Sequence, residues 1–281
     1  MFDTLISVAQ LAENLHQPDW VIVDCRFDLA DTGAGRRAYR QAHIPGAVYA
    51  HLDDDLSNPP VTDNGRHPLP PADVLAARFG QWGIGSETQV VAYDQVNGMI
   101  ASRLWWMLRY MGHTAVAVLD GGWQAWQQAG LATHDGEESN TPVLFQGKPQ
   151  SDWLVTIDEV PSVSLLVDSR DGARYRGEME TLDPVAGHIP GARHYYFQEN
   201  WTEDARYLPA HVLREKLTAV LGGVNPETAV FYCGSGVSAC VNLLAMQYAG
   251  LGNGRLYVGS WSEWSRTPGK PIATDQEEST K

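Results

Sequence analysis

The sequence is poor in cysteine, in basic residues and in long apolar runs, and each shortage excludes a class of protein. Its three cysteines, Cys25, Cys233 and Cys240, cannot form a disulfide framework, so we expect thiols in a reducing compartment. Only 20 basic residues oppose 34 acidic ones, and the formal net charge of −14 argues against nucleic acid or an anionic membrane as partner. No apolar run approaches the roughly 18 residues of a membrane span.

The remaining bulk properties indicate a globular protein of two domains. A length of 281 residues with 43% hydrophobic residues is enough for two separate cores. The first five residues, Met-Phe-Asp-Thr-Leu, lack the basic start and apolar core of a signal peptide. We therefore expect a cytoplasmic protein.

The most informative stretch runs from residue 229 to residue 250 and reads as strand, cysteine, glycine-rich loop and amphipathic helix. Apolar residues recur at helical spacing from Val237 to Tyr248, and Gly250 lies where a helix C-cap is expected. A loop that closes onto a helix N-terminus carries backbone N–H groups without intrahelical partners. The stretch is therefore typical of an anion-binding loop.

Cys233 stands at the start of this loop and is the candidate nucleophile. Gly234 and Gly236 are expected to let the loop amides curl inward, because glycine tolerates positive φ. Those donors, together with the positive end of the helix dipole, favour thiolate over thiol at the cysteine. The alternative interpretation is a buried structural cysteine after a core strand. Cys240, seven residues further on and along the helix, is expected only to pack.

Five short blocks of the first half recur in the second half at spacings of 138 to 145 residues. The paired blocks are 21–26 with 165–170, 43–47 with 188–192, 71–75 with 209–213, 91–94 with 230–233, and 122–126 with 260–264. This period is too long for a solenoid and indicates a duplicated domain. We predict a first domain over 1–137, a linker over 138–150 and a second domain over 151–281.

Each half alternates short apolar strands with helical patterns, which predicts an α/β fold: a small parallel sheet with helices on both faces. The first half is expected to contain strands at 20–23, 90–93 and 115–119 and helices at about 71–79 and 100–111. Binding sites in such sheets lie beyond the carboxyl ends of the strands, where the loops from Asp94 and Cys233 begin. Asp94 is the first-half residue that corresponds to Cys233 in the repeat. A carboxylate cannot act as a sulfur nucleophile, so the first domain is predicted to be non-catalytic.

The two halves, each with a His-Ile-Pro-Gly-Ala block and only the second with a cysteine loop, resemble the tandem rhodanese-domain sulfurtransferases. The loop Cys-Gly-Ser-Gly-Val-Ser at 233–238 is more similar to that of 3-mercaptopyruvate sulfurtransferases than to the Cys-Arg-Lys-Gly loop of typical thiosulfate sulfurtransferases. The resemblance implies that Cys233 takes sulfur from a small anionic donor, becomes a persulfide, and passes the sulfur to a thiol, thioredoxin or cyanide. It also implies that no metal or organic cofactor is needed.

The resemblance further assigns roles to the loop and to one arginine. The loop is expected to stabilise the negative charge on the sulfur through Gly234, Gly236, Val237 and Ser238. Ser235 is expected to take part in catalysis. Arg174 matches the arginine that binds the donor's anionic group, a role that suits a guanidinium because it can hold a carboxylate with two hydrogen bonds. The alternative interpretation of Arg174 is a solvated arginine near a helix start.

Two first-domain residues match a relay proposed for the mercaptopyruvate enzymes. Asp53 and His67 are expected to form a Ser–His–Asp arrangement with Ser235 that moves a proton during donor cleavage. The opposing interpretation is a solvated acidic run at 53–55 and a histidine that only packs in a Pro/Gly loop.

One departure from the family pattern concerns the donor. Mercaptopyruvate enzymes carry a second substrate arginine about nine residues after the first, where this chain has Asp183. The absence of this second arginine is expected to weaken mercaptopyruvate binding, so thiosulfate remains a candidate donor.

Several residues recur in both halves, and we expect structural roles for them because only one half is catalytic. Arg170 repeats Arg26 and is predicted to pair with nearby carboxylates, while His188 repeats His43. The tryptophans at helical spacing are predicted to be core residues; they are Trp105, Trp106, Trp123, Trp126, Trp261 and Trp264.

Two other functions compete with sulfur transfer. A cysteine phosphatase of the Cys-x5-Arg type needs an arginine six residues after the cysteine, where this chain has Ala239. A non-catalytic module could carry sulfur on Cys233 or dock a partner through its tryptophans. Turnover of a small donor distinguishes an enzyme from such a module.

Overall fold

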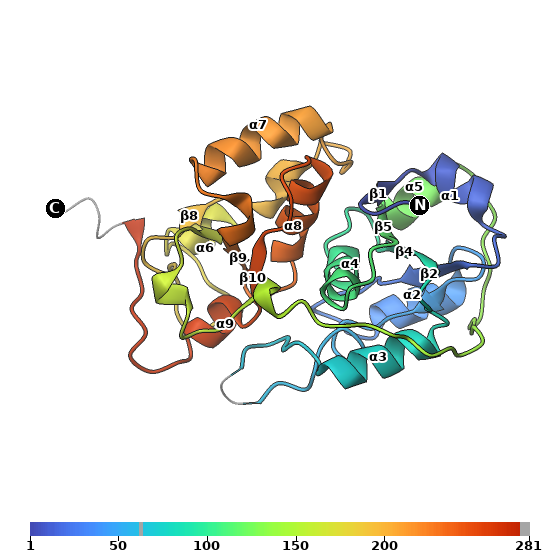
Figure 1. Cartoon of the computed structure of the whole chain (residues 1–281), viewed down its shortest axis with the longest axis horizontal. Coiled ribbons are helices and arrows are strands. Elements are labelled where there is room, and N and C mark those ends of the chain that lie inside the picture. The colour runs from blue at the N-terminus through green and yellow to red at the C-terminus, as the bar shows by residue number, and fades with distance from the viewer. Residues whose placement is uncertain (62–63, 276–281) are drawn as a thin grey trace. The chain divides into compact units, whose positions relative to one another are not determined.

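The computed structural model describes residues 1–61 and 64–275, which divide into two compact units (Figure 1). The first unit contains Met1–Asn58, Pro70–Gln150 and Trp201–Tyr207, and the second contains Pro59–Leu69, Ser151–Asn200 and the chain from Leu208 onward. The units thus follow the two halves of the sequence except for two short segments. Residues 59–69, which include His67, belong to the second unit.

The first unit contains a five-stranded parallel sheet in the order β1-β5-β4-β2-β3. Its strands are β1 (Leu5–Ile6), β2 (Trp20–Asp24), β3 (Val48–Tyr49), β4 (Gln89–Tyr93) and β5 (Val116–Leu119). Its helices are α1 (Val8–Asn14), α2 (Ala34–Gln41), α3 (Ala72–Gln81), α4 (Ala101–Tyr110) and α5 (Gly122–Gln128).

The second unit repeats that sheet in the order β6-β10-β9-β7-β8, again with parallel pairing. Its strands are β6 (Leu154–Val155), β7 (Leu166–Asp168), β8 (Arg193–His194), β9 (Val230–Tyr232) and β10 (Arg255–Tyr257). Its α-helices are α6 (Gly172–Tyr175), α7 (Ala210–Leu221), α8 (Ala239–Tyr248) and α9 (Ser260–Trp264). Short 3-10 helices are η1 (Ser151–Trp153), η2 (Val160–Ser162), η3 (Phe197–Asn200) and η4 (Pro226–Thr228).

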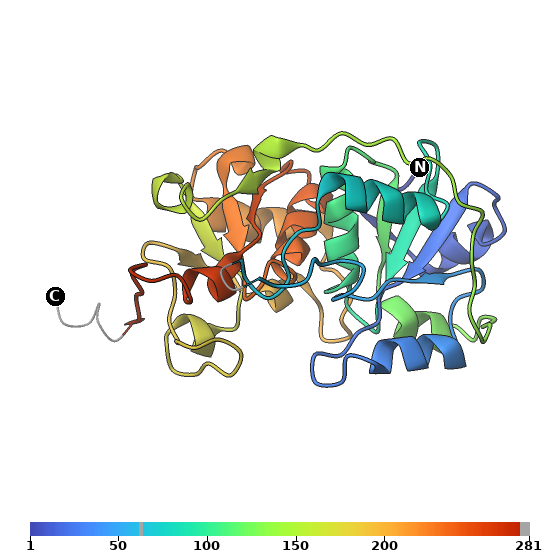
Figure 2. The ribbon, with the colours of Figure 1, turned by 90° about the horizontal axis from the view of Figure 1, so that it is seen from below.

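The two sheets share one strand order, which is the structural form of the sequence repeat. Each predicted strand and helix of the first half is present, with ends within two residues of the predicted ones. Helices lie on both sides of each sheet, as Figure 1 and Figure 2 show. The central strands β4 and β9 are buried along their whole length, as expected for parallel strands covered on both faces.

Alternate residues of β9 enter different cores of the second unit. Val230 and Tyr232 pack in a cluster with Trp261 and Trp264 of α9. Phe231 points to the other face, where α8 packs against β9, β10 and α7. All six tryptophans predicted to be core residues are buried, which confirms that prediction.

The prediction of an amphipathic helix after the cysteine loop is wrong in one respect. Every residue of α8 from Ala239 to Met246 is buried, not only those on one stripe. The helix lies between β9 and β10 on one side and α7 and η3 on the other, so it has no solvent-facing side to mark with charge. Gly250 follows the C-cap with φ +70°, in the left-handed conformation expected at a helix end.

A buried ion pair recurs at the carboxyl end of β2 and β7. Arg170 binds the Asp168 carboxylate through Nε and Nη2, donates to Gly187 O at 2.6 Å and stacks over Trp261 at 4.5 Å. Arg26 does the same with Asp24, Ala42 O and Trp123. These contacts confirm that the repeated arginine is structural.

The repeated histidines are likewise part of the scaffold. Nδ1 of His43 lies 2.8 Å from Tyr39 O, and Nδ1 of His188 lies 2.8 Å from Tyr175 O. Both rings are buried and stack on the same tyrosines. Among the residues that the structure describes, no helix is both long and apolar enough to cross a bilayer.

Candidate active site

Cys233 follows β9, the central strand of the second sheet, and is only 1% exposed. Its N–H donates to Ser260 Oγ at 3.1 Å, and its carbonyl accepts from the Trp261 N–H at 3.0 Å. The next carbonyl, of Gly234, accepts from the Ser262 N–H at 2.9 Å. The first turn of α9 therefore fixes the backbone on which the cysteine stands.

The loop after Cys233 carries backbone donors without protein partners. Among the described residues, the N–H groups of Gly234, Ser235, Val237 and Ser238 have no hydrogen-bond acceptor. The segment is nevertheless mostly buried, so these donors lack the usual compensation by secondary structure. An anion at the cysteine would supply the missing acceptor.

The first unit shows what such a loop does when an anion stands at its head. Asp94 occupies the equivalent position after β4, and its carboxylate accepts from four backbone N–H groups at 2.8 to 3.3 Å. The donors are Val96, Gly98, Ile100 and Ala101. Burial raises the pKa of Asp94, and these hydrogen bonds act in the opposite direction. The repeated loop is thus a ring of amides around one anionic side chain.

The two glycines of the cysteine loop serve different purposes, and the expectation of positive φ is wrong for Gly234. Only Gly236 has a positive φ, of +76°, and a Cβ there would lie 2.5 Å from Val258 O. At Gly234 the missing Cβ leaves room for a neighbour instead, since a Cβ there would lie 2.9 Å from Nη2 of Arg66 and would displace that flexible guanidinium.

We expect Gly236→Ala to distort the cysteine loop and to lower sulfur transfer at least tenfold. Alanine at positive φ costs about 1–2 kcal/mol, and the contact with Val258 O adds to that cost. Gly191→Ala is the matched control, because Gly191 has φ +80° but nothing within 4 Å of its Cβ position. Equal activity in the two variants, measured beside their urea midpoints, would contradict a steric role for Gly236.

His67 and Ser235 are brought together as predicted, although 168 residues separate them. Nδ1 of His67 lies 2.7 Å from Oγ of Ser235, and both residues are 7% exposed. This hydrogen bond lies within the second unit, because residues 59–69 belong to it. The hydrogen bond therefore does not favour the alternative interpretation, in which His67 only packs in its loop.

Asp53, the third member of the predicted relay, belongs to the first unit. Burial raises the pKa of its carboxyl, the His51 imidazole opposes the shift and the Asp54 charge adds to it. Its part in the relay stays a prediction.

Arg174 lies on α6 and points its guanidinium toward the cysteine loop. Its Nη1 and Nη2 atoms are each 3.5 Å from the Cβ position of Gly234. Nε and Nη2 both donate to the Glu180 carboxylate at 2.9 Å, a two-bond pairing that fixes the orientation of the fork. Burial alone would raise the pKa of Glu180, but the Leu182 N–H and the arginines hold it below its usual value.

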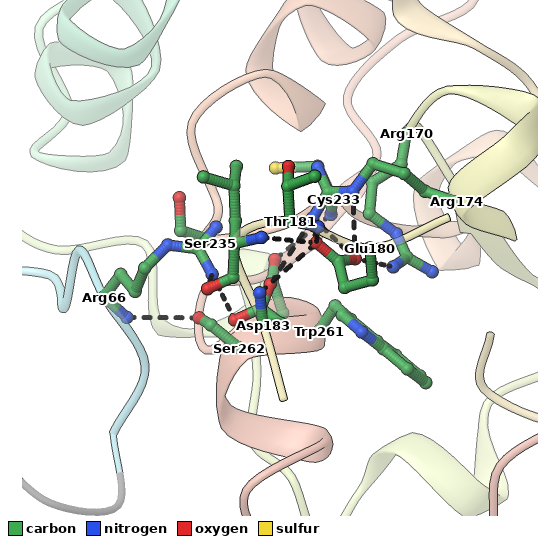
Figure 3. A network of polar contacts seen from close by, with 12 residues as sticks. Arg66, Arg170, Arg174, Glu180, Thr181, Asp183, Cys233, Ser235, Trp261 and Ser262 are labelled. Carbon is green, nitrogen blue, oxygen red and sulfur yellow. Dashed lines mark hydrogen bonds and ion pairs between the residues drawn. The ribbon is translucent and has the colours of Figure 1, made fainter. Parts of the chain in front are cut away.

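The side chain of Asp183, noted in the sequence as a departure, lies buried among guanidinium groups (Figure 3). Arg66 pairs directly with Oδ1, Nη1 of Arg266 is 3.3 Å from the same atom, and Nη2 of Arg174 is 3.4 Å from Oδ2. The backbone N–H of Arg66 also donates to Ser262 Oγ at 3.1 Å, and this hydrogen bond fixes the position of the Arg66 backbone.

Comparisons with known proteins bear on this geometry. The family model described as "Rhodanese-like domain" matches twice, over residues 7–129 and 151–267. A Pseudomonas aeruginosa protein named a probable 3-mercaptopyruvate sulfurtransferase is 45% identical over 96% of this chain and 98% of its own. The chain belongs to the rhodanese-like sulfurtransferases.

Other relatives of this sulfurtransferase are named for both donors. A Mycobacterium tuberculosis protein, provisionally named a thiosulfate sulfurtransferase, is 37% identical over 95% of this chain and 96% of its own. The solved 3-mercaptopyruvate sulfurtransferase from Leishmania major superimposes with a TM-score of 0.84 at 32% identity, covering 94% of this chain and 74% of that one. The alternatives of a phosphatase and of a non-catalytic module are not favoured by these matches.

Sequence reasoning missed Arg66 and Arg266, which the structure places in the arginine cluster beside the cysteine loop. Arg66 directly precedes His67, so its proximity to the site followed from the prediction for its neighbour. Arg266 lies two residues beyond α9, and no sequence signal marks it. The pairing of three arginines with Asp183 depends on three segments far apart in the chain.

Proposed function

We propose that this sulfurtransferase moves sulfur from 3-mercaptopyruvate through a persulfide on Cys233 to a thiol. The observation that carries the proposal is the juxtaposition at the cysteine loop: unpartnered amides after Cys233, with the guanidinium of Arg174 beside Gly234. The amides suit the charge on sulfur, and the arginine suits a donor carboxylate. Thiosulfate is the second candidate donor, since its sulfonate-like end could use the same arginine.

In the first half-reaction the Cys233 thiolate attacks the sulfur of the donor. An S–S bond forms, the C–S bond of mercaptopyruvate breaks, and its electron pair goes to the carbon as the enolate of pyruvate. The sulfur's proton stays on the persulfide or is lost to solvent, and the enolate takes up one proton to become pyruvate. No electrons enter or leave the pair of reactants.

The hydrogen bond between His67 and Ser235 supports a route for that proton. A Ser235 hydroxyl held by Nδ1 of His67 at 2.7 Å can donate toward the developing enolate while the imidazole replaces the proton. Asp53 would orient the imidazole in this proposal.

In the second half-reaction an acceptor thiolate attacks the outer sulfur of the persulfide. The S–S bond to Cys233 breaks, and its electron pair returns to Cys233 as thiolate, so the enzyme is regenerated. Small thiols, reduced thioredoxin and cyanide are the acceptors that we propose. Cys25 and Cys240 are buried and form no disulfide, which fits the predicted reducing, cytoplasmic setting.

Replacing Arg174 by alanine is expected to raise KM for mercaptopyruvate about 10-fold to 100-fold, because a charge-assisted hydrogen bond to the donor is lost. Arg176→Ala, two residues on, is the matched control: its side chain is 43% exposed and pairs only with Glu178 among the described residues. Steady-state kinetics with thiocyanate detection measures both. An unchanged KM in the Arg174 variant would remove this residue from donor binding.

The donor is tested by comparing kcat/KM for 3-mercaptopyruvate and thiosulfate with one acceptor, first cyanide and then reduced thioredoxin. We expect mercaptopyruvate to be preferred. A preference for thiosulfate would contradict the proposed donor while leaving the persulfide chemistry in place.

A further inference from the structure

The loop after α6 places a carboxylate inside the arginine cluster beside the cysteine loop. Asp183 has a side-chain exposure of 0% and touches the guanidinium groups of Arg66, Arg174 and Arg266. The three arginines come from residues 59–69, from α6 and from the chain beyond α9. A buried carboxylate that contacts three guanidinium groups holds them in place and lowers the net positive charge of the cluster by one unit.

These arginines lie next to the residue that follows Cys233. Nη2 of Arg66 is 2.9 Å and the two Nη atoms of Arg174 are 3.5 Å from the Cβ position of Gly234. Figure 3 shows Asp183 between Arg66 and Arg174, with Cys233 above them. Any anionic donor whose sulfur reaches Cys233 therefore comes under the field of this cluster.

The cluster carries a small excess of positive charge. Four arginines face three carboxylates, and the set is Arg66, Arg170, Arg174 and Arg266 with Asp168, Glu180 and Asp183. Two of the arginines are held by two-bond carboxylate pairs, Arg170 by Asp168 and Arg174 by Glu180. One unit of positive charge is left in the cluster, so the negative charge of Asp183 weakens the attraction for a dianion more than the attraction for a donor with one negative charge.

We propose that Asp183 is a specificity-determining residue that sets the charge of the donor site and thereby favours donors with a single carboxylate over dianionic thiosulfate. The inference rests on the proposed function, because it assumes that the donor meets Cys233. Asp183 acts through the arginines and takes no part in the bond-making steps. Each described guanidinium of the cluster is already paired with a carboxylate, so a second negative charge in this partly buried site gains less than the first.

The decisive variant is Asp183→Asn, which keeps the shape and one acceptor oxygen but removes the charge. We expect kcat/KM for thiosulfate relative to mercaptopyruvate to rise about tenfold at fixed ionic strength, since one added unit of charge a few ångströms away acts more strongly on a dianion. Glu227→Gln is the matched control, because it makes the same change of net charge on an exposed residue before β9, at the opposite end of the sheet from Cys233. Its donor ratio is expected to equal that of the unaltered protein.

A variant of opposite sign keeps the inference testable if Asp183→Asn does not fold. Arg266→Gln lowers the charge of the cluster by one and is expected to reduce the same ratio about threefold, the smaller effect reflecting its 34% exposed side chain. A ratio within twofold of the unaltered protein in both variants, or a lowered ratio in Asp183→Asn, would overturn the role of Asp183.

A separate readout distinguishes this failure from failure of the proposed function. Each variant is treated with mercaptopyruvate alone, and the mass of Cys233 is measured. Persulfide at Cys233 with an unchanged donor ratio rejects the inference about Asp183 and keeps the proposed function. Absence of persulfide in the unaltered protein with either donor rejects the proposed function itself.

Discussion

Cys233→Ser is expected to abolish sulfur transfer from every donor, to below the detection limit of a thiocyanate assay. The serine hydroxyl is isosteric enough to keep the bond from the backbone N–H to Ser260 Oγ, but it forms no persulfide. The far-UV circular dichroism spectrum and the urea midpoint are expected to stay close to those of the unaltered protein, since the loop backbone is fixed by α9.

Cys240→Ala is the control for this experiment. Cys240 is buried on α8 and its Sγ donates a weak hydrogen bond to Gly236 O at 3.4 Å, so its removal is expected to change transfer only a few-fold. Transfer retained by Cys233→Ser, or lost only in Cys240→Ala, would reject Cys233 as the nucleophile.

Arg170→Ala is expected to cost about 3–5 kcal/mol of unfolding free energy, the largest stability effect that we foresee. The substitution leaves Asp168, which is 0% exposed, without its guanidinium partner and removes the stacking on Trp261. Urea unfolding followed by tryptophan fluorescence measures the change.

Two variants serve as controls for the ion pair. Arg26→Ala breaks the equivalent pair in the first unit and is expected to destabilise the protein by a similar amount, because Arg26 has the same partners. Arg176→Ala removes an exposed arginine of the second unit and is expected to leave the midpoint nearly unchanged. A stable Arg170→Ala variant would show that the buried pair is dispensable.

The repeat made most of the fold predictable from the sequence. Blocks that recur at near-constant spacing required two domains with one strand order, and the sheets have that order. The same logic separated structural residues from candidate functional ones: Arg26 and Arg170 repeat, whereas the position of Cys233 corresponds to Asp94 in the first half. The hydrogen bonds to the Asp94 carboxylate then show, within this chain, how the loop holds an anion.

The parts of the site that escaped prediction depend on contacts between segments distant in sequence. From the sequence, Asp183 indicated only that the second substrate arginine is absent. Nothing in the neighbouring residues reveals that Arg66 and Arg266 converge on its carboxylate. Gly234 was expected to need positive φ, yet what its lack of a Cβ provides is room for the guanidinium of Arg66. Periodicity could not show that α8 is covered on all sides, since that depends on α7 and η3.

The central claim is that one sulfur, at Cys233, carries the transferred atom. The most direct test treats the protein with 3-mercaptopyruvate without acceptor, digests it, and measures the peptide masses. We expect an added mass of about 32 Da on the peptide with Cys233, removed by a reductant or by cyanide. Unmodified Cys233 under conditions that give turnover, or the added mass on Cys25 or Cys240 instead, would contradict the account.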